Sequence, residues 1–203
     1  MQKNFLKYAT AAAFFAIGGV ANAAVIHNDG YTNGAGMYRG VGSFTVDYDA
    51  AQAGKGALSF ELFGARTVDG TNSYDDIYTV ALNGTTLFSG IFNLGGGGDE
   101  QILDNAGFTY ESFYFGYGQG GKVLVSGLVD LLAGLNTFTF SFTSPGPSNG
   151  GNHDQGIGDE SWGVNNVDLE VAPVPLPAAL PLMAGAIAGL GALGMRRRKA
   201  VAA

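Results

Sequence analysis

Short segments in which apolar and polar residues alternate recur along most of the chain. In Ser43–Asp49, the apolar residues Phe44, Val46 and Tyr48 occupy every second position, and Ala57–Phe63 repeats the pattern. Because neighbouring side chains of a β-strand point to opposite faces, a period of two predicts strands with one buried face. Further strands are predicted at Asp76–Leu82, Thr85–Phe92, Phe108–Tyr117, Lys122–Val125, Thr137–Phe142 and Ser161–Val171. The sequence therefore predicts an all-β fold, an antiparallel β-sandwich.

The residues between these segments favour tight turns. Asn83-Gly84 separates two predicted strands, and both residue types tolerate the positive φ that a two-residue hairpin turn requires. The chain contains 34 glycines and no cysteine, so it has many turn positions and no disulfide framework. A body of about 150 residues is large enough to form one hydrophobic core without disulfides.

Two stretches resemble galactose-binding-like domains, which have a jelly-roll fold. Val129–Asn136 leads into the strand at Thr137–Phe142 and is similar to the short helical turn, ending in Gly-x-Asn, of that family. Asp159–Val167 is similar to its closing strand, with Asn165 where the family usually has Asp. The resemblance implies a jelly-roll form of the sandwich.

The N-terminal segment has the three-part order of a secretory signal peptide. Lys3 and Lys7 are followed by the uncharged stretch Tyr8–Val20 and then by small residues up to Ala23. We expect signal peptidase to cut between Ala23 and Ala24. The apolar stretch is shorter than the roughly 20 residues that a membrane-spanning helix needs.

The C-terminal segment has the composition of a membrane anchor. Val171–Met195 contains no charged residue, and its Ala/Leu/Gly-rich part, Ala178–Met195, is long enough to span a bilayer as a transmembrane helix. The basic cluster that follows would remain on the cytoplasmic side, which places the body outside the cytoplasm. We therefore expect an exported precursor that is held transiently at the inner membrane.

This tail resembles the VPLPA variant of the PEP-CTERM sorting signal, in which a Pro motif precedes an apolar span and an Arg-rich end. The matching residues are Val174, Pro175, Leu176, Pro177 and Ala178 together with Arg196, Arg197 and Arg198. Leu176 stands where the PEP form of the signal has Glu. The resemblance implies a Gram-negative bacterium, cleavage near the Pro motif by an exosortase-type membrane protease, and transfer to the cell surface or extracellular polysaccharide. The expected organisation is a signal peptide at 1–23, a sandwich at 24–172 and a sorting tail at 173–203.

The charge and the residue types exclude several functions. Six of the ten basic residues lie in the two ends, so the expected body keeps four basic residues against all 17 acids, a net charge of −13. Such a surface repels nucleic acid. The sequence contains two histidines, His27 and His153, but no Gly-x-Ser-x-Gly motif whose serine a histidine could activate as a nucleophile. Adjacent acids such as Asp75-Asp76 point to opposite faces of a strand and cannot form a glycosidase pair. We expect the body not to be an enzyme.

Calcium is the cofactor that the acids suit best. The loop before the closing strand is rich in Asn, Asp and Gly, and we expect Asp154, Asp159 and Glu160 to provide oxygen ligands for a structural Ca²⁺. The spacing does not match an EF-hand loop. No other cofactor is expected.

Two classes of function remain open: a non-catalytic surface or matrix protein that contacts polysaccharide, and a secreted glycan-active enzyme. Aromatic residues gather at Tyr110, Phe113, Tyr114, Phe115 and Tyr117. Such residues fill cores more often than they stack on sugars, so we expect them to be buried. Outward aromatics would favour the first class, and a cleft with two facing acids would favour the second.

Overall fold

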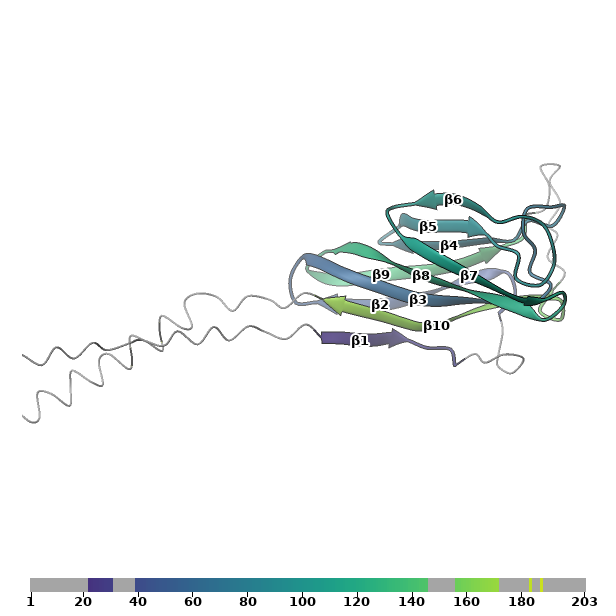
Figure 1. Cartoon of the computed structure of the whole chain (residues 1–203). Helices are drawn as coiled ribbons and strands as arrows, with labels where there is room; N and C mark the ends of the chain where they lie inside the picture. Colours follow the sequence, from purple (N-terminus) through teal and green to yellow (C-terminus); the bar gives the residue numbers. More distant parts are fainter. Residues whose placement is uncertain (1–21, 31–38, 146–155, 172–182, 184–186, 188–203) are drawn as a thin grey trace, which may run out of the picture. The chain divides into compact units, whose positions relative to one another are not determined.

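The computed structural model describes residues 22–30, 39–145, 156–171, 183 and 187. Ten strands lie in one compact unit, Ala21–Ala172. Their bounds are β1 (Asn22–His27), β2 (Gly42–Ala50), β3 (Gly54–Arg66), β4 (Ile77–Leu82), β5 (Thr85–Ile91), β6 (Gln101–Asn105), β7 (Thr109–Gly116), β8 (Gly120–Leu131), β9 (Gly134–Thr143) and β10 (Glu160–Val171) (Figure 1).

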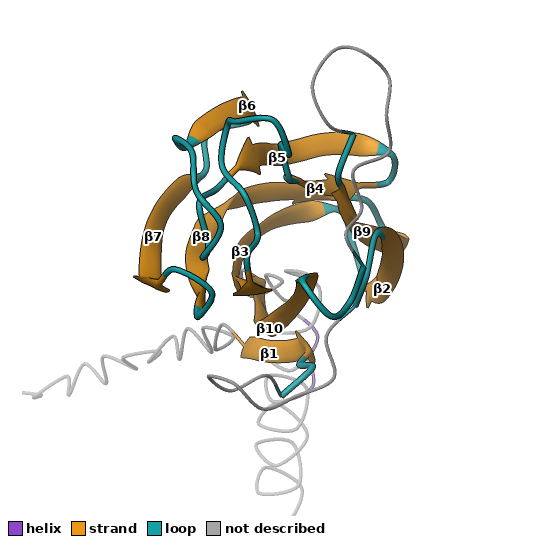
Figure 2. Cartoon of the chain, turned by 90° about the vertical axis from the view of Figure 1, so that its right-hand side faces the viewer, coloured by secondary structure: helices purple, strands orange, loops and turns teal. Residues whose placement is uncertain are grey.

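The strands form two five-stranded antiparallel sheets that face each other. Their orders are β1-β10-β3-β8-β7 and β2-β9-β4-β5-β6. Figure 2 shows one sheet on each side of the sandwich, with β6 and β7 at the same edge. The chain crosses between the sheets at β1–β2, β2–β3, β3–β4, β6–β7, β8–β9 and β9–β10, as in a jelly-roll-like sandwich. The predicted all-β antiparallel sandwich is confirmed.

The core consists of the inward side chains that the alternation predicted. Val46, Leu58, Phe60 and Leu62 are buried, as are the aromatic residues of β9. Trp162 on β10 is fully buried, and its indole Nε1 donates a 2.7 Å hydrogen bond to the carbonyl of Gly40. This bond satisfies the polar atom that the ring brings into the core.

The predicted hairpin is present between β4 and β5. Asn83 and Gly84 have φ values of 51° and 80°, so both central residues take the positive φ of a type I′ turn. The turn matches the twist of the two strands, and it fixes their register.

The predicted helical turn at Val129–Asn136 is wrong. Val129 to Leu131 complete β8, and β9 begins at Gly134 after a tight turn. The buried side chain of Asn136 closes this turn: its Oδ1 accepts a hydrogen bond from the Leu132 amide, and its Nδ2 donates to the carbonyls of Leu132 and Gly134. The Gly-x-Asn sequence thus forms a side-chain-closed β-turn instead of ending a helix.

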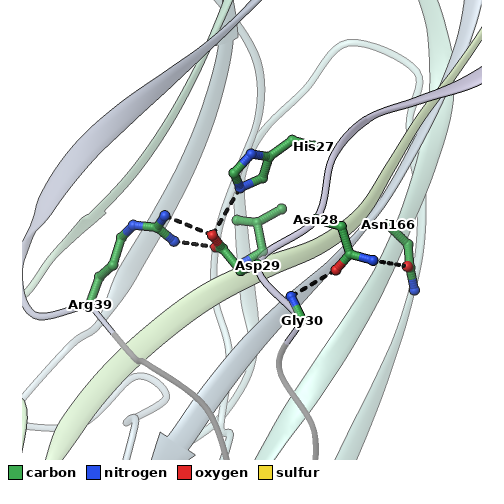
Figure 3. Close-up of polar contacts among 7 residues, drawn as sticks. His27, Asn28, Asp29, Gly30, Arg39 and Asn166 are labelled. Atoms are coloured by element: carbon green, nitrogen blue, oxygen red, sulfur yellow. Dashed lines mark hydrogen bonds and ion pairs between the residues drawn. The ribbon is translucent and has the colours of Figure 1, made fainter.

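The segment after β1 is tied to β10 through Asp29. Figure 3 shows Arg39 donating to both carboxylate oxygens of Asp29, with His27 Nε2 lying 3.0 Å from Oδ1. The amide of Val164 on β10 also donates to Oδ2, at 3.2 Å. Burial alone would raise the pKa of Asp29, but the bonds from Arg39 and Val164 and the charges of Arg39 and His27 lower it overall.

Both expected terminal segments lie largely outside the described residues. The backbone of Asn22 and Ala23 is in β1, which pairs with β10, so the predicted cut after Ala23 falls within this strand. Within the tail, the described residues Met183 and Ile187 are helical, whereas the predicted Pro motif at 174–178 and the Arg-rich end lie outside. Among the described residues, no helix has the length and apolar character that a membrane crossing requires.

Candidate functional site

The glycine run Gly95–Gly98 packs directly on the loop that joins β3 to β4. The amides of Leu94 and Gly96 donate to the carbonyl of Val68, at 3.0 and 3.1 Å, and the amide of Gly70 donates to Gly97 at 2.6 Å. A Cβ atom at Gly96 would overlap the carboxyl of Asp69. Glycine is therefore required for this close approach, which encloses the side chain of Asp69.

Three carboxyl groups meet beneath this loop. Asp69 and Asp76 come from the two ends of the β3–β4 loop, and Glu160 begins β10. Their exposed fractions are 7%, 0% and 0%, and one oxygen atom of each lies within 4.8 Å of the other two. Three buried carboxyl groups at this separation form an arrangement able to hold a metal ion.

The described hydrogen bonds support the first two carboxyl groups. The amide of Asp69 donates to Asp76 Oδ2 at 2.7 Å, and Asn72 Nδ2 donates to Asp69 Oδ1 at 2.8 Å. Three of the four basic side chains in the described body pair with acids elsewhere: Arg39 with Asp29, Lys55 with Asp130, and Lys122 with Glu61.

The proximity of these acids changes their ionisation. Burial raises the pKa of Asp76 to about 8, and the charges of Glu160 and Asp69 act in the same direction. Burial also raises the pKa of Asp69, together with the charges of Asp159 and Asp75 and against the hydrogen bond from Asn72. Without a cation, Asp76 therefore holds a proton at neutral pH.

Two buried oxygen atoms at this place lack a hydrogen-bond partner among the described residues. They are Asp76 Oδ1 and the hydroxyl Oγ of Ser144, which follows β9 and is 2% exposed. The two side chains face each other: no hydrogen bond of ordinary geometry joins them, but the polar contact with the Ser144 hydroxyl lowers the pKa of the Asp76 carboxyl. Buried polar atoms are nearly always paired, so both atoms indicate that a ligand belongs here.

The structure places the predicted calcium residues differently. Glu160 lies in the cluster, whereas Asp159 Oδ1 accepts a 2.5 Å hydrogen bond from the hydroxyl of Thr67. Asp154 lies outside the described residues. Sequence reasoning missed Asp69 and Asp76 as partners of Glu160, although the adjacent acids Asp75-Asp76 were a visible signal.

A second feature is a row of exposed tyrosines on the edge strand β7 and in the turn after it. The exposed fractions of Tyr110, Tyr114 and Tyr117 are 41%, 52% and 77%. Tyr110 packs against Phe88 and Phe92, with ring centroids at 6.0 and 5.6 Å, and keeps the rest of its ring in solvent. The expectation that these aromatic residues fill the core is wrong for all three tyrosines.

A third feature is a shallow depression on the outer face of the β7–β8–β3–β10 sheet, with a volume of about 610 Å³. Its lining includes the acids Glu61, Glu111 and Asp168. Glu61 accepts hydrogen bonds from Lys122 Nζ at 3.1 Å and from Asn166 Nδ2 at 3.2 Å. One of its acids is therefore already held by other side chains.

No protein-family model matches this chain, and no curated protein matches it. Among solved structures, it is similar to a CBM35 from Cellvibrio japonicus Abf62, with 13% identity and a TM-score of 0.34 over 78% of this chain and 89% of that chain. It is also similar to Xyl-CBM35 in complex with a glucuronic acid containing disaccharide, with 14% identity and a TM-score of 0.31 over 79% and 96% of the two chains. A third similar structure is a family 35 carbohydrate binding module from an environmental isolate, with 14% identity and a TM-score of 0.29 over 79% of this chain and 90% of that chain.

Proposed function

We propose that this protein is an exported, non-catalytic surface or extracellular-matrix protein whose sandwich contacts polysaccharide through Tyr110, Tyr114 and Tyr117. The observation that carries the proposal is the exposure of these three tyrosines along one strand and its turn. Tyrosine rings offer a flat apolar face for a sugar ring and a hydroxyl for hydrogen bonding.

The spacing of the rings suits a polymer. Tyr110 and Tyr114 are four residues apart in a regularly paired part of β7, so they lie on the same face of the strand. At about 3.3 Å per residue, their backbones are about 13 Å apart. Two tyrosine rings at this separation would contact two different sugar residues of a polysaccharide and not one sugar. The net charge of −13 in the expected body favours a neutral polysaccharide over an anionic one.

Glycan binding by the purified protein tests this proposal. On an array of neutral and anionic polysaccharides, we expect binding to neutral chains that Tyr114→Ala and Tyr117→Ala each weaken. Loss of one stacking contact corresponds to about 0.5–1.5 kcal/mol, or roughly 2- to 12-fold in affinity. Leu135→Ala is the control, because it removes a side chain that is 63% exposed at the start of β9. Equal binding by all these variants would remove the tyrosines from the site.

Export belongs to the same proposal. We infer cleavage by signal peptidase after Ala23, a transient stay in the inner membrane, and processing near 174–178 by an exosortase-type protease. The support is the order of the terminal segments in the sequence. Mass spectrometry of the extracellular protein should find Ala24 first and no Arg196–Lys199. Replacing these four basic residues with Ala should make unprocessed precursor accumulate, and an intact basic end outside the cell would contradict the proposal.

A glycan-active enzyme is the second candidate, and the outer depression is the observation that favours it. Glu61 and Glu111 each pair with Leu124 from opposite sides, so they lie two strands apart on one face. Their backbones are thus about 10 Å apart, near the range of an inverting glycosidase pair. Hydrolysis of a polysaccharide that Glu61→Gln or Glu111→Gln abolishes would establish this function instead of simple binding.

A further inference from the structure

We propose that Asp69, Asp76 and Glu160 bind one Ca²⁺ ion, with the hydroxyl of Ser144 beside it. The site uses Glu160 as the sequence predicted, but its other ligands come from the β3–β4 loop instead of from the loop before β10. It does not depend on polysaccharide binding.

The oxygen separations fit calcium. Ca²⁺ binds oxygen at 2.3–2.6 Å, so two ligands on opposite sides of one ion lie about 5 Å apart. One oxygen from each of the three carboxyl groups lies within 4.8 Å of the others, so all three reach a common centre. Mg²⁺ binds at 2.0–2.1 Å, demands an octahedral shell and usually keeps several waters, which suits this enclosed cluster less well.

The unpartnered atoms provide independent support. Asp76 Oδ1 and Ser144 Oγ are buried without a hydrogen-bond partner among the described residues. Carboxylate and hydroxyl oxygens are both ligands for hard cations, so one ion would satisfy the two atoms together. It would also take the place of the proton that Asp76 holds without a cation.

The position of the site explains what the ion would do. The β3–β4 loop crosses between the sheets, Glu160 begins β10 in one sheet, and Ser144 follows β9 in the other. An ion at this place would connect both sheets at one end of the sandwich. Because the ligands come together on folding, the ion would bind the folded state and stabilise it.

Calorimetric titration and thermal unfolding of the full-length chain test the proposal, with CaCl2, with MgCl2 at equal ionic strength, and with EDTA. We expect Ca²⁺ to bind and to raise Tm above the value in Mg²⁺ or EDTA. Asp76→Asn preserves the shape of the side chain and should weaken Ca²⁺ binding roughly 10- to 100-fold or more, since loss of an outer-shell partner already costs that much. Asp49→Asn, at an exposed position of β2, is the matched control and should bind as the wild type does.

Two further variants separate the alternatives. Asp69 is the most exposed of the three ligands, so its substitution should disturb folding least. If circular dichroism shows that Asp76→Asn does not fold, Asp69→Asn is used in its place. Asp159→Asn changes the residue that Thr67 holds outside the cluster, so it removes a nearby charge but no ligand and should weaken Ca²⁺ binding much less than Asp76→Asn does. Loss of binding in Asp159→Asn alone, or identical melting of the wild type in Ca²⁺, Mg²⁺ and EDTA, would overturn the proposal.

Discussion

Asn136 offers a direct test of how the turn between β8 and β9 is stabilised. Its buried amide makes four hydrogen bonds: Oδ1 accepts from the amide of Leu132 and from Asn83 Nδ2, and Nδ2 donates to the carbonyls of Leu132 and Gly134. The side chain is therefore fully satisfied, and it connects the β8–β9 turn to the β4–β5 hairpin. Asn136→Ala removes all four bonds at once.

The expected cost follows from these four bonds. A hydrogen bond contributes about 0.5–1.5 kcal/mol net, and the turn beside Asn136 is exposed, so water can replace part of what is lost. We therefore expect Asn136→Ala to lower the free energy of unfolding by about 2–4 kcal/mol. For a domain of this size, each kcal/mol corresponds to about 2–4 °C, so Tm should fall by roughly 4–16 °C.

Urea unfolding followed by circular dichroism measures this change, and an unaltered m-value would show that the denatured state is the same. Leu135→Ala is the neighbouring control and should stay within about 0.5 kcal/mol of the wild type. Asn136→Asp keeps the acceptor but places a carboxylate against two carbonyls, so it should be at least as harmful as Asn136→Ala. An Asn136→Ala variant within about 0.5 kcal/mol of the wild type would refute the role of this side chain.

Two further stability predictions concern other parts of the sandwich. The pKa of Asp29 is lowered from 3.8, so its bonds with Arg39 stabilise the protein above that pH and the contribution is lost as the pH falls through the lower folded-state pKa. Unfolding free energies of wild type and Asp29→Asn should therefore differ at pH 7 and converge on acidification, and a constant difference would contradict the ion pair. Gly96→Ala should destabilise the protein, because a Cβ there overlaps Asp69, whereas Gly97→Ala meets nothing closer than 3.9 Å and should be nearly neutral. Equal melting temperatures for these two variants would contradict the packing.

The strands that bury one face could be predicted from the sequence. In β2 and β3, apolar and polar residues alternate because the core lies on one side, and this is the signal that periodicity detects. The strand β6 was missed because none of its five residues is buried, so no such pattern forms. The end of β8 was misread because Val129–Asn136 was interpreted by its resemblance to galactose-binding-like domains, although Val129, Asp130 and Leu131 alternate between buried and exposed as in a strand.

The candidate cation site could be predicted only in part, for a different reason. Glu160 stood out because it precedes a recognisable closing strand, but Asp69 and Asp76 lie more than 80 residues before it. They meet because β3 pairs with β10, which brings the β3–β4 loop to the start of β10. Composition does not encode such pairing, so acids that look like an ordinary charged loop become buried by the topology.

The exposed tyrosines and the acid cluster are joined by the same glycine run. Gly96 packs on Asp69, and the carbonyl of Gly95 accepts a 2.8 Å hydrogen bond from the amide of Gly118, next to Tyr117. Tyr110 instead rests on Phe88 and Phe92 in the core. An ion that fixes Asp69 would therefore order the turn that carries Tyr117 more than it would order Tyr110. In this arrangement the proposed cation would not touch a sugar, and it would act on the proposed polysaccharide contact through the backbone of the glycine run.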